Sequence, residues 1–302
     1  MKTLMVFLHG IGDCIMFTPA LKFYKEKHSS DEISVLCLKL TEELWKSNHL
    51  VKNVFVSSYF KNPPSHGNII QYIFERIKIQ KEINWIKQKY GIDKVIYIVP
   101  WSIRLFNISI PLPGKLRRLP LFYKLEDHEV LKLCKHLQVN DNKTWPYDFK
   151  QTIFISDKHR KKASGIIKNL GTKKPICIMH TSASSGNKSL SEKEAEGIIN
   201  YLKSKGIGVI LINSNLNFKK VKKINSDSVL LSAALIEYCD LFIGIDSGPA
   251  HIAEVLNKPS IVIAKAFRTE LLYIKKDNSL LLDKYDYNKI TKGIDDFLAL
   301  SF

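Results

Sequence analysis

The fold of the first half is decided by Leu4-Met5-Val6-Phe7-Leu8-His9-Gly10-Ile11-Gly12-Asp13, a short apolar run that ends in two glycines and an aspartate. Such a run is typical of a buried strand that meets a tight turn. A helical pattern follows from Cys14 to Lys22. Open α/β sheets bind their ligands at the carboxyl ends of the strands, so the carboxylate of Asp13 is the first candidate functional group.

The composition indicates a globular protein of about two domains. The chain has 302 residues, 45% of them hydrophobic and 25% charged, which is enough apolar material for two cores. Lysine and arginine number 46 against 29 acidic residues, which leaves a net charge of +17. This excess favours anionic partners such as phosphorylated substrates, a membrane face or nucleic acid, although a solvated lysine-rich surface explains it equally well.

The cysteines and the N-terminal segment indicate the compartment. None of the cysteines forms a C-x-x-C pair, and the scattered set is Cys14, Cys37, Cys134, Cys177 and Cys239. This pattern is typical of free thiols in a reducing compartment. The first apolar run is too short for a signal peptide, and no stretch approaches the roughly 20 apolar residues of a spanning helix. We therefore expect a cytoplasmic protein, with a peripheral contact at the inner face of the inner membrane left open.

Strand and helix patterns alternate along the chain. In the first half the strand patterns cover 3–8, 33–38, 53–57 and 94–99, and the helix patterns cover 17–27, 68–90 and 126–138. In the second half the strand patterns cover 175–179, 207–212, 228–231, 241–245 and 260–263, and the helix patterns cover 157–169, 191–204, 232–238, 249–257 and 288–300. Such alternation predicts parallel sheets with helices on both faces.

A polar segment at 140–150 is the best candidate linker. We therefore predict an α/β protein with two Rossmann-like, doubly wound domains, residues 1–150 and 151–302, that face each other across a cleft. The last helix, 288–300, could pack back on the N-terminal domain.

A second turn follows the apolar run at 241–245 and reads Asp246-Ser247-Gly248-Pro249-Ala250-His251. Asp246 or Ser247 can cap the next helix, and the N–H groups at such a helix start form an anion site. Gly248 would let a phosphate approach the backbone closely. An ordinary capped helix has the same pattern, and His251 alone is more typical of a buried core histidine.

A third turn follows the apolar run at 176–179 and reads His180-Thr181-Ser182-Ala183-Ser184-Ser185-Gly186-Asn187-Lys188. Hydroxyls, backbone N–H groups and one ammonium suit a diphosphate. The P-loop pattern is absent, and serine-rich turns are common, so this segment alone is weak support. A dinucleotide fingerprint at Gly10 and Gly12 is disfavoured, because Ile15 replaces its third glycine and Asp13 would repel a pyrophosphate.

Taken in order, these segments resemble glycosyltransferase family 9, the ADP-heptose:lipopolysaccharide heptosyltransferases. The family's opening motif, Gly-x-Gly-Asp and then Thr-Pro-Ala-Leu, is similar to residues 10–13 and 18–21. Its C-terminal motif, Asp-Ser/Thr-Gly-x-x-His-x-Ala, resembles residues 246–253, with Lys258-Pro259 following. The loop at 180–188, with a histidine, hydroxyls and a later lysine, is similar as well. The resemblance extends over nearly the whole chain.

The resemblance implies a GT-B fold and an inverting, metal-independent transfer of a sugar, with heptose from ADP-heptose expected first, onto a lipopolysaccharide core or another surface glycan. Asp13 is then the base that deprotonates the acceptor hydroxyl, and Lys188 offsets the charge of the leaving diphosphate. The donor-binding residues implied are Gly12, Thr181, Ser182, Asp246, Ser247, Gly248 and His251. No Asp-x-Asp pair occurs in the sequence to hold a metal. A structural alternative makes Asp13 the N-cap of the helix.

Two departures from the family pattern leave the donor's base and sugar open. The turn at 213–218 has no carboxylate where relatives often carry one, and Ser189-Leu190 replaces an aromatic that often follows the loop lysine. On the acceptor side, Arg104, Arg117 and Arg118, with His128 after them, could grip phosphates or carboxylates. A solvated basic loop is the alternative.

Rival functions therefore stay open beside the transferase. The altered turn at 213–218 motivates a GT-B-like protein that binds a nucleotide or glycan without turnover, or a transferase that uses another nucleotide sugar. Nucleic-acid binding rests on net charge alone, without a recognition motif. We expect a nucleotide sugar and a glycan or lipid-linked acceptor as partners, no nucleic acid and no metal cofactor.

Overall fold

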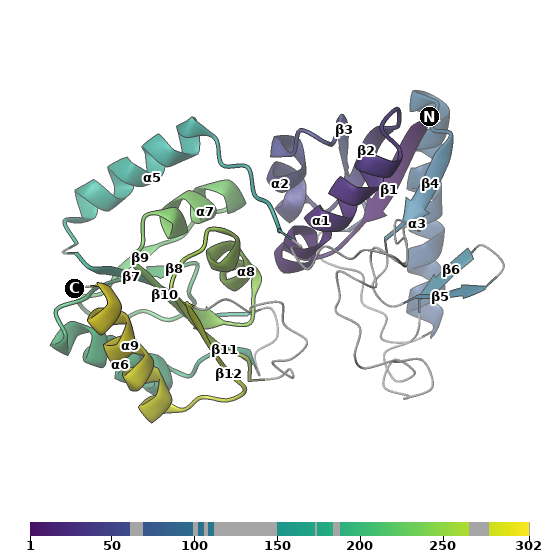
Figure 1. Ribbon diagram of the computed structural model, residues 1–302. Helices are drawn as coiled ribbons and strands as arrows, with labels where there is room; N and C mark the ends of the chain where they lie inside the picture. The colour runs from purple at the N-terminus through teal and green to yellow at the C-terminus, as the bar shows by residue number, and fades with distance from the viewer. Residues whose placement is uncertain are drawn as a thin grey trace. The chain divides into compact units, whose positions relative to one another are not determined.

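The computed structural model describes residues 1–60, 69–98, 102–105, 108–111, 150–172, 174–183, 188–265 and 278–301. The chain divides into two compact units, Met1–Thr152 and Ile153–Phe302, each with its own parallel sheet (Figure 1). This confirms the predicted α/β class. No helix in the described parts of the chain is long and apolar enough to cross a membrane.

The first unit is built on a four-stranded sheet of order β3-β2-β1-β4, whose neighbouring strands are all parallel. The strands are β1 Lys2–Phe7, β2 Glu32–Cys37, β3 Asn53–Val56 and β4 Lys94–Tyr97. Strand β1 is central and buried from Thr3 to Phe7, which explains the apolar run from Leu4 to Phe7. A separate antiparallel pair consists of β5 Ser102–Leu105 and β6 Ile108–Pro111.

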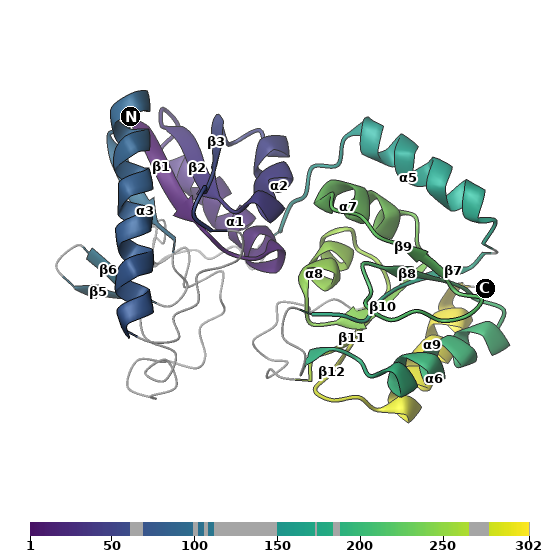
Figure 2. The ribbon, with the colours of Figure 1, turned by 180° about the vertical axis from the view of Figure 1, so that it is seen from behind.

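Helices cover both faces of this sheet. They are α1 Ile11–Lys27, α2 Glu42–Ser47 after a 3-10 turn at Lys39–Thr41, and α3 Ile69–Tyr90. Figures 1 and 2 show α1 and α3 on opposite faces of the sheet. Because side chains alternate along a strand, Leu4 and Val6 pack with α3, whereas Phe7 stacks on Phe17 of α1 with ring centroids 4.9 Å apart.

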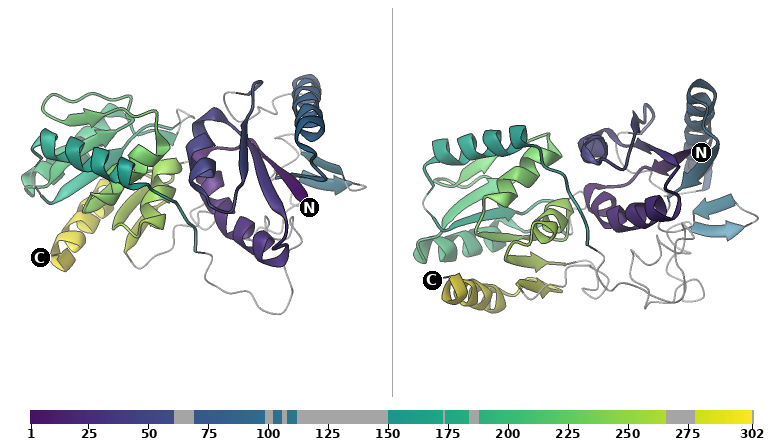
Figure 3. Two further views of the ribbon diagram at one scale, coloured as in Figure 1. Left: turned by 90° about the horizontal axis from the view of Figure 1, so that it is seen from above. Right: turned by 45° about the horizontal axis from the view of Figure 1, so that its top comes forward.

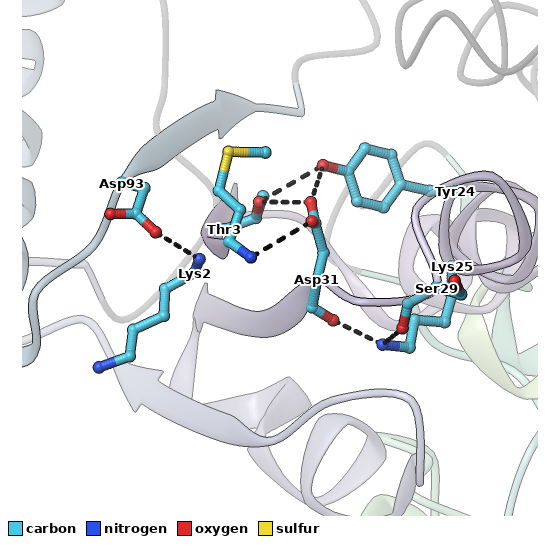
Figure 4. Close-up of polar contacts among 8 residues, drawn as sticks. Lys2, Thr3, Tyr24, Lys25, Ser29, Asp31 and Asp93 are labelled. Carbon is cyan, nitrogen blue, oxygen red and sulfur yellow. Dashed lines mark hydrogen bonds and ion pairs between the residues drawn. The ribbon is translucent and has the colours of Figure 1, made fainter.

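A buried polar cluster lies at the amino end of β1 (Figure 4). Tyr24 Oη and Thr3 Oγ1 donate to Asp31 Oδ2 over 3.0 and 3.1 Å. Burial alone would raise the pKa of the Asp31 carboxyl, but the two hydroxyl donors together with the N-terminal ammonium and His28 hold this pKa below its usual value. The cluster ties the end of α1 to the starts of β1 and β2.

The second unit is built on a six-stranded sheet of order β12-β11-β10-β7-β8-β9, in which every neighbouring pair is parallel. The strands are β7 Ile176–His180, β8 Gly208–Ile212, β9 Lys222–Ile224, β10 Leu241–Ile245, β11 Ser260–Ile263 and β12 Ser279–Leu282. In the central pairs, Gly244 of β10 lies opposite His180, and Ile245 lies opposite Ile263. The carboxyl ends of β7, β10 and β11 therefore meet at one edge.

Helices again cover both faces, so each unit is doubly wound. They are α5 Asp157–Leu170, α6 Glu192–Ser204, α7 Val229–Glu237, α8 Gly248–Val255 and α9 Tyr287–Ser301. Figure 3 shows α5 and α7 on one side of the sheet and α6 and α9 on the other. The possibility that the last helix packs back on the N-terminal domain stays a prediction. Within the second unit, Ile290, Ile294 and Phe297 of α9 join the hydrophobic core, and α9 packs against α6.

The structure corrects some of the predicted elements. The strand predicted at 228–231 is wrong, because Ser228 caps α7 by accepting a hydrogen bond from Leu231 N, and residues 229–236 are all buried in that helix. A buried helix and a buried strand have the same short apolar pattern. The first helix begins at Ile11, with Gly10 as its N-cap, rather than at residue 17. The predicted helix at 126–138 and most of the linker lie outside the described residues.

The cysteines that the structure describes, Cys14, Cys37, Cys177 and Cys239, are buried free thiols. Burial raises the pKa of Cys37 and of Cys239 to about 12, so these thiols stay protonated and inert at neutral pH. Cys134 lies outside the described residues.

Candidate active site

The turn after β1 presents Asp13 in the first turn of α1. Gly10 is the N-cap, and Asp13 Oδ2 accepts a hydrogen bond from Gly10 N over 3.3 Å. Asp13 is thus the third helical residue and not the N-cap that the structural alternative expected. Gly12 lies beside it, and both are half-buried. A carboxylate in the first turn of a helix interacts favourably with the positive end of the helix, and the hydrogen bond from Gly10 N fixes the position of this side chain.

The turn rests on packed aromatic rings. Phe7 stacks on Phe17, and Trp45 meets Phe7 edge-on with centroids 5.5 Å apart. His9 donates from Nε2 to the carbonyl oxygen of Ile98 over 2.9 Å, which ties this turn to the end of β4. His9 was not among the site residues predicted from the sequence. The sequence indicates only that His9 directly precedes the turn at Gly10. Its contact with Ile98 could not be predicted, because the two residues are 89 positions apart.

The Thr-Pro motif in α1 anchors the segment that leads out of the first unit. Thr18 Oγ1 donates to the carbonyl oxygen of Ile15 over 2.8 Å and accepts from Thr152 N over 2.9 Å. Thr152 is the last residue of the first unit. The hydroxyl of Thr18 therefore fixes the start of the connection between the units.

At the carboxyl edge of the second sheet, Asp246 lies between two basic side chains. Lys188 Nζ donates to Asp246 Oδ2 over 3.0 Å, and His251 Nε2 lies 4.0 Å from Asp246 Oδ1. The Lys188 and Asp246 side chains are 23% and 11% exposed, and His251 is buried. The fold thus brings together three predicted site residues from the loop after β7, the end of β10 and the helix α8.

The start of α8 lies directly after Asp246. Ser247 is the N-cap, but its hydroxyl donates backwards to the carbonyl oxygen of Ile245 over 3.1 Å. Among the described residues, no side chain caps this helix. Gly248 and Pro249 form its first turn, so the positive end of the helix is left for an anion.

The hydroxyls after β7 hold the neighbouring turn. The Thr181 hydroxyl is buried and shares a 2.6 Å hydrogen bond with the Ser214 hydroxyl, and Ser182 Oγ accepts from Asn215 N over 2.8 Å. His180 donates from Nδ1 to the Ile212 carbonyl, and burial lowers the pKa of its imidazole, so it is neutral at pH 7. Thr181 and Ser182 therefore shape the turn at 213–218, and their donor contacts stay a prediction.

A further lysine, Lys265, lies at this edge and was not predicted from the sequence. Lys265 follows β11 and donates to Glu194 Oε2 over 2.6 Å and to the Ser189 carbonyl over 3.2 Å. Glu194 also accepts from Ser191 at the start of α6. Burial alone would raise the pKa of Glu194, but Lys265 and Ser191 hold it below its usual value. The sequence signal was a lysine two residues after the end of a buried strand.

The predicted acceptor residues contribute no side-chain geometry. Arg104 lies on β5, and only its backbone is described, whereas Arg117, Arg118 and His128 lie outside the described residues. Within the described ranges, no group of three or more His, Cys, Asp or Glu side chains is placed to hold a metal ion.

The arrangement offers two kinds of chemistry, one on each unit. The first unit presents a fixed carboxylate that can accept a proton. The second presents an uncapped helix start beside an ammonium, which is a site for a phosphate group.

One family model matches part of the chain. Residues 126–264 match the family model for glycosyltransferase family 9 (heptosyltransferase), a range that contains Lys188, Asp246 and His251. No curated protein sequence matches the chain.

Solved structures share the fold over the whole chain. A glycosyltransferase family 9 protein from Veillonella parvula superposes with a TM-score of 0.66 at 16% identity and covers 97% of this chain and 89% of its own. ADP-heptose lps heptosyltransferase II of E. coli has a TM-score of 0.64 at 14% identity, with 99% of both chains covered. E. coli heptosyltransferase WaaC with ADP has a TM-score of 0.60 at 14% identity, with 98% and 100% covered. The chain therefore matches the glycosyltransferase family 9 (heptosyltransferase) model over residues 126–264 and has the fold of these solved heptosyltransferases.

Proposed function

We propose that this protein transfers a sugar from a nucleotide diphosphate to a hydroxyl of a lipopolysaccharide core or another surface glycan, with inversion and without a metal. Heptose from ADP-heptose is the first donor to test, because the family match and the similar E. coli enzymes concern heptosyltransferases. The observation that carries the proposal is the start of α8. There the Ser247 hydroxyl donates to the carbonyl oxygen of Ile245 and does not cap the helix. Lys188 is held next to this helix start by its hydrogen bond to Asp246.

The second unit binds the donor diphosphate in this proposal. N–H groups at the head of α8 and the Lys188 ammonium stabilise the charge that builds on the departing nucleotide. Asp246 positions Lys188 through their 3.0 Å hydrogen bond. The turn at 213–218, held by Thr181 and Ser182, borders this edge and sets which nucleoside fits.

The first unit supplies the base. Asp13 takes the proton of the acceptor hydroxyl while that oxygen attacks the anomeric carbon and the bond from this carbon to the diphosphate oxygen breaks. A positioned base of this kind contributes about 10²–10⁴-fold to the rate. One base is sufficient for an inverting displacement, because the nucleophile attacks the face opposite the leaving group.

Acceptor-dependent release of nucleotide tests the proposal. ADP-heptose is incubated with the protein, with and without a lipopolysaccharide core oligosaccharide, and released ADP is measured. We expect release that requires the acceptor and is unchanged by EDTA. Release that EDTA abolishes and added metal restores would contradict metal independence and leave the transfer itself standing.

A protein that binds without turnover is the second candidate, because the turn at 213–218 has no carboxylate. Ligand-observed NMR with ADP-, UDP-, GDP- and CDP-sugars distinguishes the two candidates and identifies the base. Saturable binding of one nucleotide sugar, without release under any acceptor, would favour the binding protein.

We also propose a cytoplasmic location with a peripheral membrane contact. A lipid-linked acceptor lies in an anionic leaflet, and basic residues near such a surface each contribute about 1 kcal/mol. The net charge of +17 supports this contact.

A further inference from the structure

The outward face of α3 combines large apolar side chains with lysines. Phe74, Ile77 and Trp85 are 61%, 47% and 54% exposed, and Lys78 and Lys81 between them are also exposed. Positions three or four residues apart share one face of a helix, so this stripe runs on to Lys89, over about 22 Å at ~1.5 Å per residue. We name Phe74, Ile77, Lys78, Lys81, Trp85 and Lys89 the α3 stripe.

The core fixes the direction in which the stripe points. Ile79, Ile83 and Ile86 lie on the other side of α3 and pack into the core with Leu4 and Val6 of β1. The helix therefore cannot turn its apolar exposed side chains inward without giving up this packing. Figure 2 shows α3 lying along one face of its sheet.

The exposed side of α3 carries positive charge, whereas Glu82 faces the sheet. The exposed charged side chains described on α3 are all lysines, namely Lys78, Lys81, Lys87 and Lys89. Glu82 is turned toward the sheet side, where it accepts from the Ser57 and Ser58 hydroxyls over 2.7 and 3.0 Å. The outward surface is thus basic as well as apolar.

At its carboxyl-terminal end, the α3 stripe has the chemistry of a membrane interface. Lys89 Nζ lies 4.7 Å from the centroid of the Trp85 ring, and Tyr90 meets Trp85 edge-on at 6.2 Å. Tryptophan and tyrosine suit the headgroup level of a bilayer, and lysine stems can lie along apolar surface while the ammonium reaches a phosphate.

We infer that the α3 stripe docks this protein on an anionic lipid bilayer, with Phe74, Ile77 and Trp85 entering the headgroup region and the lysines pairing with lipid phosphates. A second copy of the chain fits poorly, because a symmetric contact would place the same lysines against one another. Interleaved apolar and basic side chains on a helix are typical of binding in the plane of an anionic membrane.

Vesicle sedimentation of the full chain tests the surface without any donor or acceptor. We expect binding to phosphatidylcholine vesicles that contain phosphatidylglycerol, little binding to phosphatidylcholine alone, and weaker binding as salt rises. Lys78→Ala with Lys81→Ala should weaken binding to the anionic vesicles about 30-fold. Phe74→Ala with Trp85→Ala should weaken it at least tenfold.

A matched control separates this surface from net charge. Lys158→Ala with Lys162→Ala removes the same charge from exposed positions on α5 and should leave vesicle binding within about twofold. Equal loss in both double variants would overturn the inference. Retention on RNA or DNA with no vesicle binding would overturn it in favour of a nucleic-acid surface.

Tryptophan fluorescence gives an independent readout. Anionic vesicles should shift the emission of the wild type to the blue, and Trp85→Phe should abolish this shift while vesicle binding remains. A shift that persists in Trp85→Phe would contradict insertion of Trp85. Failure of these binding tests would leave acceptor-dependent turnover on a soluble oligosaccharide untouched, so the two proposals can fail separately.

Discussion

Replacing Lys188 by methionine separates a structural role of this lysine from a donor-binding role. The 3.0 Å contact to Asp246 amounts to about 5 kcal/mol of Coulomb energy at an effective dielectric constant of ~20. Desolvation of the two partly buried groups cancels most of this. We therefore expect Lys188→Met to lower the free energy of unfolding by about 1–3 kcal/mol, the cost of leaving a buried acceptor unsatisfied.

The effect on ADP affinity is the functional part of the prediction. A charge-assisted hydrogen bond to the diphosphate contributes about 1.5–3 kcal/mol, so Lys188→Met should weaken ADP binding roughly 10- to 100-fold. Asp246→Asn keeps the cation and removes only the group that holds it. It should therefore weaken ADP binding far less, although it breaks the same ion pair.

Urea denaturation and calorimetric titration with ADP measure the two effects on the same samples. The matched control is Lys205→Met, which breaks the surface pair with Asp295 and should change neither quantity by more than about 1 kcal/mol. If Lys188→Met lost stability and kept wild-type ADP affinity, Lys188 would be a structural residue only. Equal loss of ADP affinity in Lys188→Met and Asp246→Asn would also refute the reasoning.

Three further predictions concern the framework of the site. Asp31→Asn should cost about 2–4 kcal/mol of stability at pH 7, because two buried hydroxyl donors lose a charged acceptor. Because the pKa of Asp31 is lower in the folded state than in the unfolded state, the extra stability of the wild type is present above pH ~4. This extra stability is lost as the pH falls through the pKa of Asp31 in the folded protein, and urea titrations of both proteins at pH 7 and pH 3 would check this. Thr18→Val should leave Thr152 N without its acceptor and speed proteolysis of the connection after residue 152, whereas Thr18→Ser should not. Gly244→Ala should destabilise the second unit by about 1–3 kcal/mol in thermal denaturation, because a Cβ there would lie 2.8 Å from the Phe242 ring.

Strands β1 and β10, which precede the turns with Asp13 and Asp246, could be predicted from the sequence. Strands β1 and β10 are buried on both faces, so each contains an apolar run closed by a polar or glycine turn, and that pattern is local. The prediction of a strand at 228–231 was wrong because residues 229–236 are buried on every side of α7. A helix that is buried all round has no polar face, so its sequence lacks the periodicity that distinguishes a helix from a strand.

The contacts that build the site could not be predicted in this way. Lys188 and Asp246 are 58 residues apart, and only the sheet order, which places β7 beside β10, brings them together. Lys265 reaches Glu194 across a similar separation. The hydroxyl of Thr181, for which a donor contact stays a prediction, shares a hydrogen bond with the hydroxyl of Ser214, 33 residues away in the sequence. The sequence therefore predicts which turns are rich in polar residues. Which of these residues form hydrogen bonds with one another depends on the tertiary fold.

The most direct test of the central claim is a single-turnover measurement of sugar transfer by Asp13→Asn. Donor and acceptor are held at saturation, so that the observed rate reports the chemical step. Glu26→Gln, which removes one exposed carboxylate from the same helix, is the matched control. We predict a loss of about 10²–10⁴-fold for Asp13→Asn with donor binding intact, and a wild-type rate for Glu26→Gln. A loss below tenfold in a folded Asp13→Asn protein would contradict the assignment of Asp13 as the base.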